Sequence, residues 1–219
     1  PNVLGNISYD LDGGSISKEK TSYTADDYGY VPPIPTKRGF EFTGWSPSNI
    51  PVNSTENVTF TAQWKEVGVA TLIDGPTLNT KLRILSGDET PFSDVNKTIQ
   101  SIQQSPTMPS ATVMQDSNSL ISVNDSDKPI YVWFEDGIIK WWSETSYIEA
   151  GNSLADAFSG MDSLTDISGL KNLHTSNVTD MSNLLSGNQS TLSDITPLSG
   201  WDVSNVTNMS WMFSGCPEL

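Results

Sequence analysis

The sequence predicts an α+β protein in three parts: a small, mostly β domain, an α+β connecting region, and a leucine-rich-repeat-like solenoid. Three observations carry this prediction. Short segments within the first 65 residues alternate between apolar and polar side chains, as half-buried strands do. The middle of the chain contains one run with helical spacing and one hairpin signal. The last third repeats itself with turns of 27–28 residues, a period typical of leucine-rich solenoids.

Alternating segments define the first domain, which we place at residues 1–65. Residues 7–11 and 40–42 alternate, and residues 58–64 alternate with one apolar face. Asp12-Gly13-Gly14 predicts a turn, because glycine adopts backbone conformations that other residues avoid. These features predict a compact β domain with a few aromatic side chains as its core.

A motif in this domain resembles a known family. Residues 35–45 read Pro-Thr-Lys-Arg-Gly-Phe-Glu-Phe-Thr-Gly-Trp, and residues 61–64 read Thr-Ala-Gln-Trp. Both segments are similar to the Listeria–Bacteroides repeat, the internalin-type B repeat, and the similarity spans about residues 6–65. The resemblance implies a β-grasp-like module of the kind found in bacterial surface proteins. It brings no catalytic residues with it.

The connecting region, residues 66–150, begins with a helix signal. Leucines at helical spacing predict a helix over residues 76–86, with Asp74 or Thr77 as its cap and Gly87 as its end. The following residues 105–127 are rich in Ser, Pro, Asn and Asp, which predicts a loop.

A hairpin is predicted at residues 130–142, after a short strand at 99–102. Its two arms flank Asp136-Gly137, a pair that favours a two-residue hairpin turn. One face of the hairpin would carry Ile130, Val132, Phe134, Ile139 and Trp141; the other would carry Tyr131, Trp133, Glu135, Ile138, Lys140 and Trp142. Because a solenoid must cover its first core layer, we expect the hairpin to act as the cap of the repeats.

The repeat region, residues 151–219, contains matching segments 28 positions apart. Ser-Asn-Val-Thr at 176–179 returns at 204–207, and Asp-Ile at 166–167 returns at 194–195. A single turn cannot enclose a core, so the apolar positions of successive turns should stack on one another. The apolar spacing of residues 181–185 predicts one helical turn in each unit. The asparagines of the Ser-Asn-Val-Thr bend should satisfy backbone groups there.

The repeat resembles a second family. Its elements are Met-Ser-x-Leu/Met-Leu/Phe-Ser-Gly, then Leu-x-Asp-Ile, then Trp-Asp-Val-Ser-Asn-Val-Thr-Asn-Met at 201–209, with Gly215-Cys216 after them. Together with the hairpin, residues of about 129–219 resemble the BspA-like leucine-rich surface proteins of bacteria. We therefore expect the solenoid to be truncated at Leu219 and further units to follow in a longer gene product.

Composition restricts the partners. The chain of 219 residues has 11 Lys and Arg against 26 Asp and Glu, a formal charge of −15 and a pI near 4.1. Such a surface repels nucleic acid and anionic membranes, so we expect no nucleic-acid partner. No apolar run has the length of a membrane span, so no membrane insertion is expected within this chain. The low charged fraction and the abundance of Ser, Thr and Asn are typical of extracellular proteins.

Residues for catalysis are scarce. His174 is the only histidine, and the next unit has Asp202 at the same position, which predicts an exposed and inert loop residue. Cys216, the only cysteine, excludes an internal disulfide and is expected to be buried. The polar run 124–127 lacks the glycine and glutamate of a calcium loop. We therefore expect no catalytic residues, no cofactor, no metal and no enzyme activity.

The functional prediction is a non-enzymatic, extracellular protein of the bacterial cell surface. Its predicted role is adhesion, as a monomer, through binding to a surface protein of a host or neighbouring cell. The alternative is a carbohydrate-binding module that uses the exposed aromatic side chains of Tyr131, Trp133 and Trp142. A third possibility stays open, in which this face packs against the first repeat or the helix, because large apolar patches are rarely left uncovered.

Overall fold

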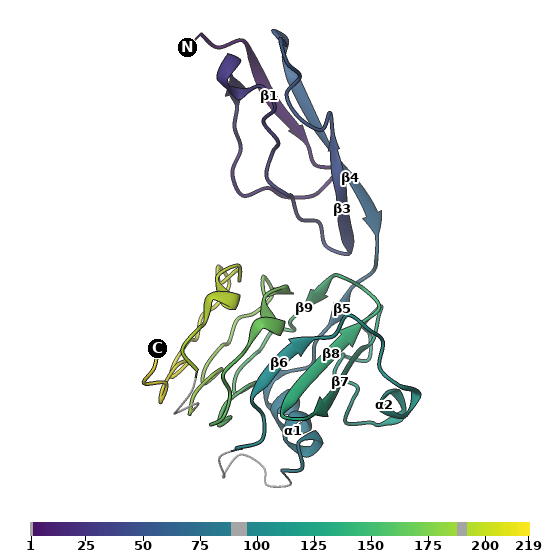
Figure 1. Ribbon diagram of the computed structural model, residues 1–219, viewed down its shortest axis with the longest axis vertical. Coiled ribbons are helices and arrows are strands. Elements are labelled where there is room, and N and C mark those ends of the chain that lie inside the picture. The colour runs from purple at the N-terminus through teal and green to yellow at the C-terminus, as the bar shows by residue number, and fades with distance from the viewer. Residues whose placement is uncertain (1, 89–95, 188–191) are drawn as a thin grey trace. The chain divides into compact units, whose positions relative to one another are not determined.

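The computed structural model describes residues 2–88, 96–187 and 192–219 and consists of two compact units. The first ends at Gly68 and the second begins at Val69. In Figure 1 the colour follows the chain from purple in the first unit to yellow at the end of the second.

The first unit is built on one open, four-stranded sheet. Its elements are β1 (Gly5–Asp10), β2 (Ser22–Tyr23), the 3₁₀ turn η1 (Ala25–Asp27), β3 (Phe40–Ser46) and β4 (Val58–Glu66). The strand order is β2-β1-β4-β3, with β1 parallel to β4 and the other pairs antiparallel. The predicted alternating segments are therefore strands, and the parallel pair is an addition that their pattern did not reveal.

Aromatic side chains form the core of the first unit. Phe60 is fully buried, and Tyr9, Trp45 and Tyr30 pack around it with ring centroids 6.0–6.4 Å away. Tyr23 is also fully buried, and its hydroxyl donates to the carbonyl oxygen of Glu56 at 2.6 Å. A buried phenol needs such a partner, so Tyr23 ties the β2 edge to the segment that leads into β4.

The β-grasp-like prediction is wrong for this unit. Its described residues contain no α-helix, and η1 is a single turn of three residues capped by Thr24. The segment between β2 and β3 carries Pro32, Pro33 and Pro35, which cannot continue a helix because proline lacks the N–H group and clashes with the preceding turn. The connection therefore runs as extended chain and leaves the sheet open.

The second unit contains two further sheets and two α-helices within its described residues. Its elements are β5 (Ala70–Thr71), α1 (Gly75–Leu85), β6 (Ser101–Gln104), α2 (Ala111–Gln115), β7 (Ile130–Glu135), β8 (Ile138–Ser143), β9 (Ile148–Glu149), η2 (Ser168–Leu170), β10 (Leu173–His174) and η3 (Thr196–Leu198). The strand orders are β6-β8-β7 and β10-β9-β5.

Helix α1 confirms the helix prediction. The carboxylate of Asp74 accepts a hydrogen bond from the Thr77 backbone N–H at 3.1 Å and so caps the first turn. Gly87 has a φ of +81°, a left-handed conformation that ends helices and favours glycine. Two of its leucines, Leu78 and Leu82, are buried in the core.

The hairpin β7–β8 also confirms its prediction. Asp136 and Gly137 both have positive φ, 49° and 86°, as a type I′ turn requires. The predicted inner face is buried at Ile130, Val132, Ile139 and Trp141 and partly buried at Phe134. Strand β6 pairs in parallel with β8, and its Ile102 N–H donates to the carbonyl of Asp166 in the repeat region at 2.8 Å. Thus β6, from an earlier part of the chain, joins the hairpin to the first repeat.

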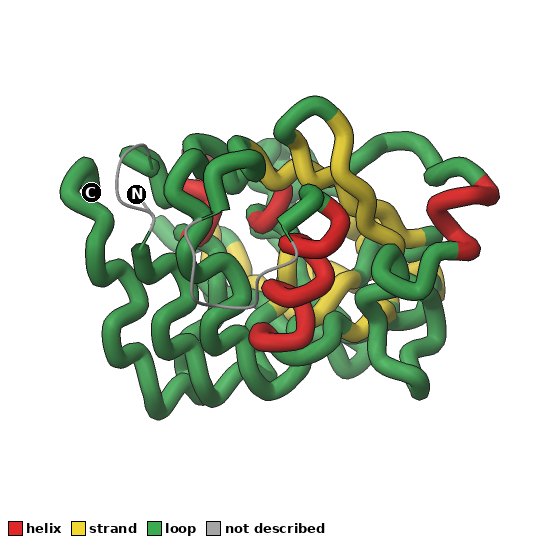
Figure 2. The backbone as a smooth tube through the Cα atoms, turned by 90° about the horizontal axis from the view of Figure 1, so that it is seen from below, coloured by secondary structure: helices red, strands yellow, loops and turns green. Residues whose placement is uncertain are grey.

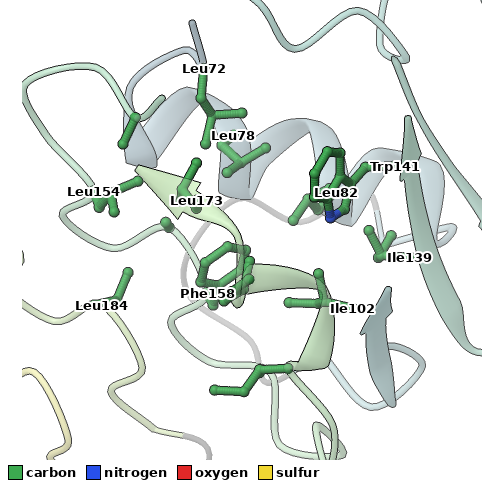
Figure 3. Close-up of a cluster of buried hydrophobic side chains, with 14 of the residues drawn as sticks. Leu72, Leu78, Leu82, Ile102, Ile139, Trp141, Leu154, Phe158, Leu173 and Leu184 are labelled. Atoms are coloured by element: carbon green, nitrogen blue, oxygen red, sulfur yellow. The ribbon is translucent and has the colours of Figure 1, made fainter. Parts of the chain in front are cut away.

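One continuous apolar core extends through the second unit. Figure 3 shows Leu82 of α1, Trp141 of β8, Phe158 and Leu184 of the repeats in this cluster. Each of these side chains is nearly or fully buried. Removing apolar side chains from water is the main favourable term in folding, so α1, the β6–β8–β7 sheet and the repeats stabilise one another.

Successive repeat units are hydrogen-bonded in register. The N–H of Phe158 donates to Leu184 O at 3.0 Å, and the N–H of Leu185 donates to Met212 O at 2.9 Å. At the Ser-Asn-Val-Thr bend, the side-chain amide of Asn205 donates to the carbonyl of Ser176, which confirms the predicted role of that asparagine. In Figure 2 these turns are mostly green loops that lie side by side.

The prediction of an α+β fold with a leucine-rich solenoid is wrong. The second unit consists mostly of small, unclosed sheets and irregular turns, and α1 and α2 are the only α-helices among the residues described in the chain. The run expected to form a helical turn does not, because Asn183 has a φ of +53°. Asp156 lies one repeat of 27 residues before Asn183, and Trp211 lies one repeat of 28 residues after it. Their φ angles are 59° and 61°. One left-handed residue per unit breaks the helix there.

Replacing Trp211 with asparagine is expected to stabilise the second unit by about 1 kcal/mol, because asparagine tolerates the left-handed conformation better than other non-glycine residues do. Trp211 is 71% exposed, so little packing is lost. Chemical denaturation of both proteins measures the change in free energy of unfolding. Ser210→Asn, at the neighbouring position without positive φ, is the control. If Trp211→Asn is no more stable than the unchanged chain, the left-handed backbone at Trp211 does not destabilise the unit.

Candidate functional site

The three predicted ligand-binding aromatics lie on the outer face of the hairpin. Tyr131 of β7 pairs with Trp142 of β8, and Trp133 pairs with Lys140 in the next row. All three rings are half-buried. Leu120 forms an isolated bridge with Tyr131, so a further chain segment runs beside β7. The face is therefore neither freely open nor fully covered, and the role of these residues in ligand binding stays a prediction.

A hollow of about 240 Å³ lies beside Trp133. Trp133, Glu135 and Lys140 line it from the hairpin, and residues 103–107 line it from β6 and the segment after β6. Tyr131 and Trp142 are not among the described residues that line it. The structure thus separates Trp133 from the other two rings and gives it amide and charged neighbours instead.

Charge in this hollow is fixed by an ion pair between Lys140 and Glu135. The hydrogen bond and the positive charge of Lys140, together with a hydrogen bond from Trp133, hold the pKa of Glu135 below its usual range. Glu135 therefore stays ionised and offers hydrogen-bond acceptors beside the indole ring.

His174 is not the exposed loop residue that the repeat predicts. It is half-buried in β10, which pairs in parallel with β9, and its ring stacks on Tyr147 with centroids 4.0 Å apart and planes 10° apart. Burial lowers the pKa of His174, and the negative charge of Glu149 opposes that shift. Asp202 in the next unit is exposed and lies in no strand, so the two equivalent positions have different environments.

A second hollow, of about 420 Å³, lies beside His174. Its polar lining consists of Gln104, Ser146, Lys171, Asn172 and His174. Its apolar lining consists of Ile148, Leu173 and Gly200. Gln104 also lines the hollow beside Trp133. No motif in the sequence marks this group, because β-sheet pairing and the repeat turns bring together residues that are far apart in the chain.

Carboxylates of the repeat units are held by their own backbone. Asp166 accepts from the N–H of Ser168, and Asp194 accepts from the N–H of Thr196, each at 2.8 Å. Burial alone would raise the pKa of Asp166, but hydrogen bonds from Ser101, Ser168 and a nearby glutamine outweigh it and lower the pKa. The side-chain and backbone hydrogen bonds of Thr196 lower the pKa of Asp194. These acids are therefore ionised and fixed in direction.

Within residues 2–88, 96–187 and 192–219, no three His, Cys, Asp or Glu side chains are grouped so that they could hold a metal ion. None of the helices in that part of the chain combines the length and apolarity that crossing a membrane requires. Cys216 is buried, as expected from the sequence, and its thiol donates to the carbonyl of Leu185 at 3.2 Å.

Each end of the chain matches a family model. Residues 6–72 match the family model of the Listeria–Bacteroides repeat domain, which confirms that resemblance. Residues 152–219 match a model described as a Mycoplasma protein of unknown function, DUF285. The pair is consistent with a BspA-like surface protein, although no leucine-rich-repeat family is shown. No curated protein and no solved structure matches the chain. Listeria–Bacteroides repeats are typical of surface proteins, and the two matches indicate a surface-type repeat protein.

Proposed function

We propose that this is a non-enzymatic adhesion protein of the bacterial cell surface, which binds a protein of a host or neighbouring cell through its acidic repeat region. The observation that carries the proposal is the pair of carboxylates of Asp166 and Asp194, which are fixed by backbone hydrogen bonds at equivalent positions of successive units. The partner's binding surface is therefore basic.

The charge balance of the repeat region supports this choice. Residues 152–219 contain seven Asp and Glu against one lysine, Lys171. Charges that are already fixed lose little freedom when a partner binds, and complementary charge speeds association and selects the partner. The same charge disfavours nucleic acid.

The double variant Asp166→Asn/Asp194→Asn is expected to weaken binding to a basic protein partner by on the order of tenfold at low salt. The chain is tested for binding to immobilised extracellular-matrix and cell-surface proteins. The affinity of each hit is then measured at about 50 and about 500 mM NaCl, a tenfold difference that clearly changes how strongly salt screens surface charges. Asn124→Ala, in an exposed loop, serves as the control. If the affinity of every hit is unchanged by salt and by the double variant, the acidic surface is not the binding face.

Carbohydrate binding is the second candidate, and the hollow beside Trp133 favours it. An indole ring next to amide groups and an ionised carboxylate offers both a stacking surface and hydrogen bonds to sugar hydroxyls. In the same screen, a glycan array separates the two candidates. Glycan hits that are lost in Trp133→Ala and kept in Asp166→Asn/Asp194→Asn would favour carbohydrate over protein.

A further inference from the structure

We propose that the 420 Å³ hollow beside His174 is a separate binding site for a six-membered sugar ring that carries a carboxylate, such as a hexuronic acid. The site lies in the second unit between β9, β10 and the turn that contains Gly200. This site differs from the adhesion surface, since neither Asp166 nor Asp194 lines it, and it differs from the hollow beside Trp133, since the aromatic ring among its described lining residues is that of His174.

The polar lining of the hollow suits an anion. Each of the polar side chains that line the hollow can donate a hydrogen bond: Gln104, Ser146, Lys171, Asn172 and His174. No carboxylate is among the described residues that line it. In a chain with 26 acidic and 11 basic residues, a hollow lined by donors and a lysine is a local exception. It favours a ligand with anionic oxygen atoms.

Lys171 is the natural partner for that anion. It is exposed and makes no ion pair with any residue in the described part of the chain. It is also the one lysine or arginine of the repeat region. A carboxylate beside it would gain a charge-assisted hydrogen bond, which is stronger than a bond between neutral groups.

The apolar lining of the hollow suits a sugar ring. The buried residues Ile148 and Leu173 line the hollow, and Gly200 adds backbone without a side chain. The imidazole of His174, which stacks on Tyr147, also lines the hollow. A sugar ring has C–H groups that suit such a surface and hydroxyl groups that suit the donors, whereas a small inorganic anion would leave the apolar surface unused.

The protonation of His174 should make binding depend on pH. Because burial lowers the pKa of His174, the imidazole is neutral at pH 7. Glu149 faces His174 with a negative charge, and Lys171 lies in the same hollow with a positive one. A bound carboxylate favours the protonated imidazole. Binding of the acidic sugar should therefore tighten as the pH falls through the pKa of His174, while binding of a neutral sugar should not change.

The test is titration of the full chain with methyl glucuronoside, followed by NMR chemical shifts. We expect saturable shifts at Lys171, Asn172 and His174, tighter binding at pH 5.5 than at pH 7.5, and binding about tenfold weaker in Lys171→Gln. Lys97→Gln, which removes an exposed lysine of the same unit outside the hollow, should bind as the unchanged chain does. His174→Gln should remove the pH dependence and keep binding at pH 7.5.

Three parallel titrations can overturn the proposal. Methyl glucoside bound as tightly as the glucuronoside would show that the carboxylate is not recognised. Acetate or inorganic phosphate bound as tightly would show an anion site without sugar recognition. Equal weakening in Lys171→Gln and Lys97→Gln would show that the effect comes from net charge. The two proposals can fail separately. Asp166→Asn/Asp194→Asn should lose protein binding and keep glucuronoside binding, whereas Lys171→Gln should lose glucuronoside binding and keep protein binding.

Discussion

Replacing Asn79 with alanine is expected to lower the free energy of unfolding of the second unit by about 3 kcal/mol. Asn79 is fully buried in α1, and its amide nitrogen donates to the carbonyls of Asp156 and Ser159 at 2.9 and 3.0 Å. Its amide oxygen accepts from Nε of Arg83 at 2.8 Å. Alanine removes these bonds, including the buried one to Nε of Arg83, and takes a donor from two part-buried carbonyl groups of the first repeat, which costs more than the loss of an average hydrogen bond.

Urea denaturation followed by circular dichroism measures this change. Asn124→Ala, an exposed asparagine of the same unit, is the control and should change stability by less than about 0.5 kcal/mol. Similar stability of the two variants would mean that α1 is joined to the repeats by apolar packing alone.

Replacing Val178 with aspartate is expected to unfold the second unit. Val178 is fully buried in the core of that unit, and an unpaired carboxylate there costs several kcal/mol, comparable with the whole stability of a domain. Val206, its equivalent one unit later, is only half-buried, so Val206→Asp should cost less. The Val178 variant should lose the cooperative thermal transition of this unit.

A conservative variant and the first unit are the controls for Val178→Asp. Val178→Thr keeps the size and shape of the side chain and should leave the unit folded with a lower melting temperature. The first unit has a separate core around Phe60, so its own transition should remain in every variant. A native-like melt of the second unit in Val178→Asp would contradict the burial of this position.

Local signals in the sequence were sufficient where neighbours along the chain decide the structure. Asp74 and Gly87 define the ends of α1, and Asp136-Gly137 defines the turn of the hairpin, because in each case the deciding contacts lie within a few residues. The short helix α2 lies in the segment predicted as loop. Its capping serine, Ser110, is a weak signal among many polar residues.

Non-local pairing explains most of what the sequence did not predict. The parallel pairing of β6 with β8 and of β1 with β4 has no local marker, and the β6–β8 pairing is what brings Gln104 toward the hairpin. The apolar spacing around Asn183 fits a helical turn, but its left-handed backbone is set by the in-register contact with Ser210 of the next unit. The aromatic face of the hairpin followed from alternation, whereas the hollows depend on segments far apart in the chain.

The hydrogen bonds between successive repeat units have a mechanical consequence. Gly160 donates to Ser186 O and Gly187 donates to Ser214 O, so each unit is attached to the next by bonds that point from layer to layer. A pulling force that separates the layers loads these bonds directly and in small groups, while the buried side chains resist as a second barrier. Under tension, this region should extend in several small steps at modest force, and each step dissipates work before the next layer is loaded.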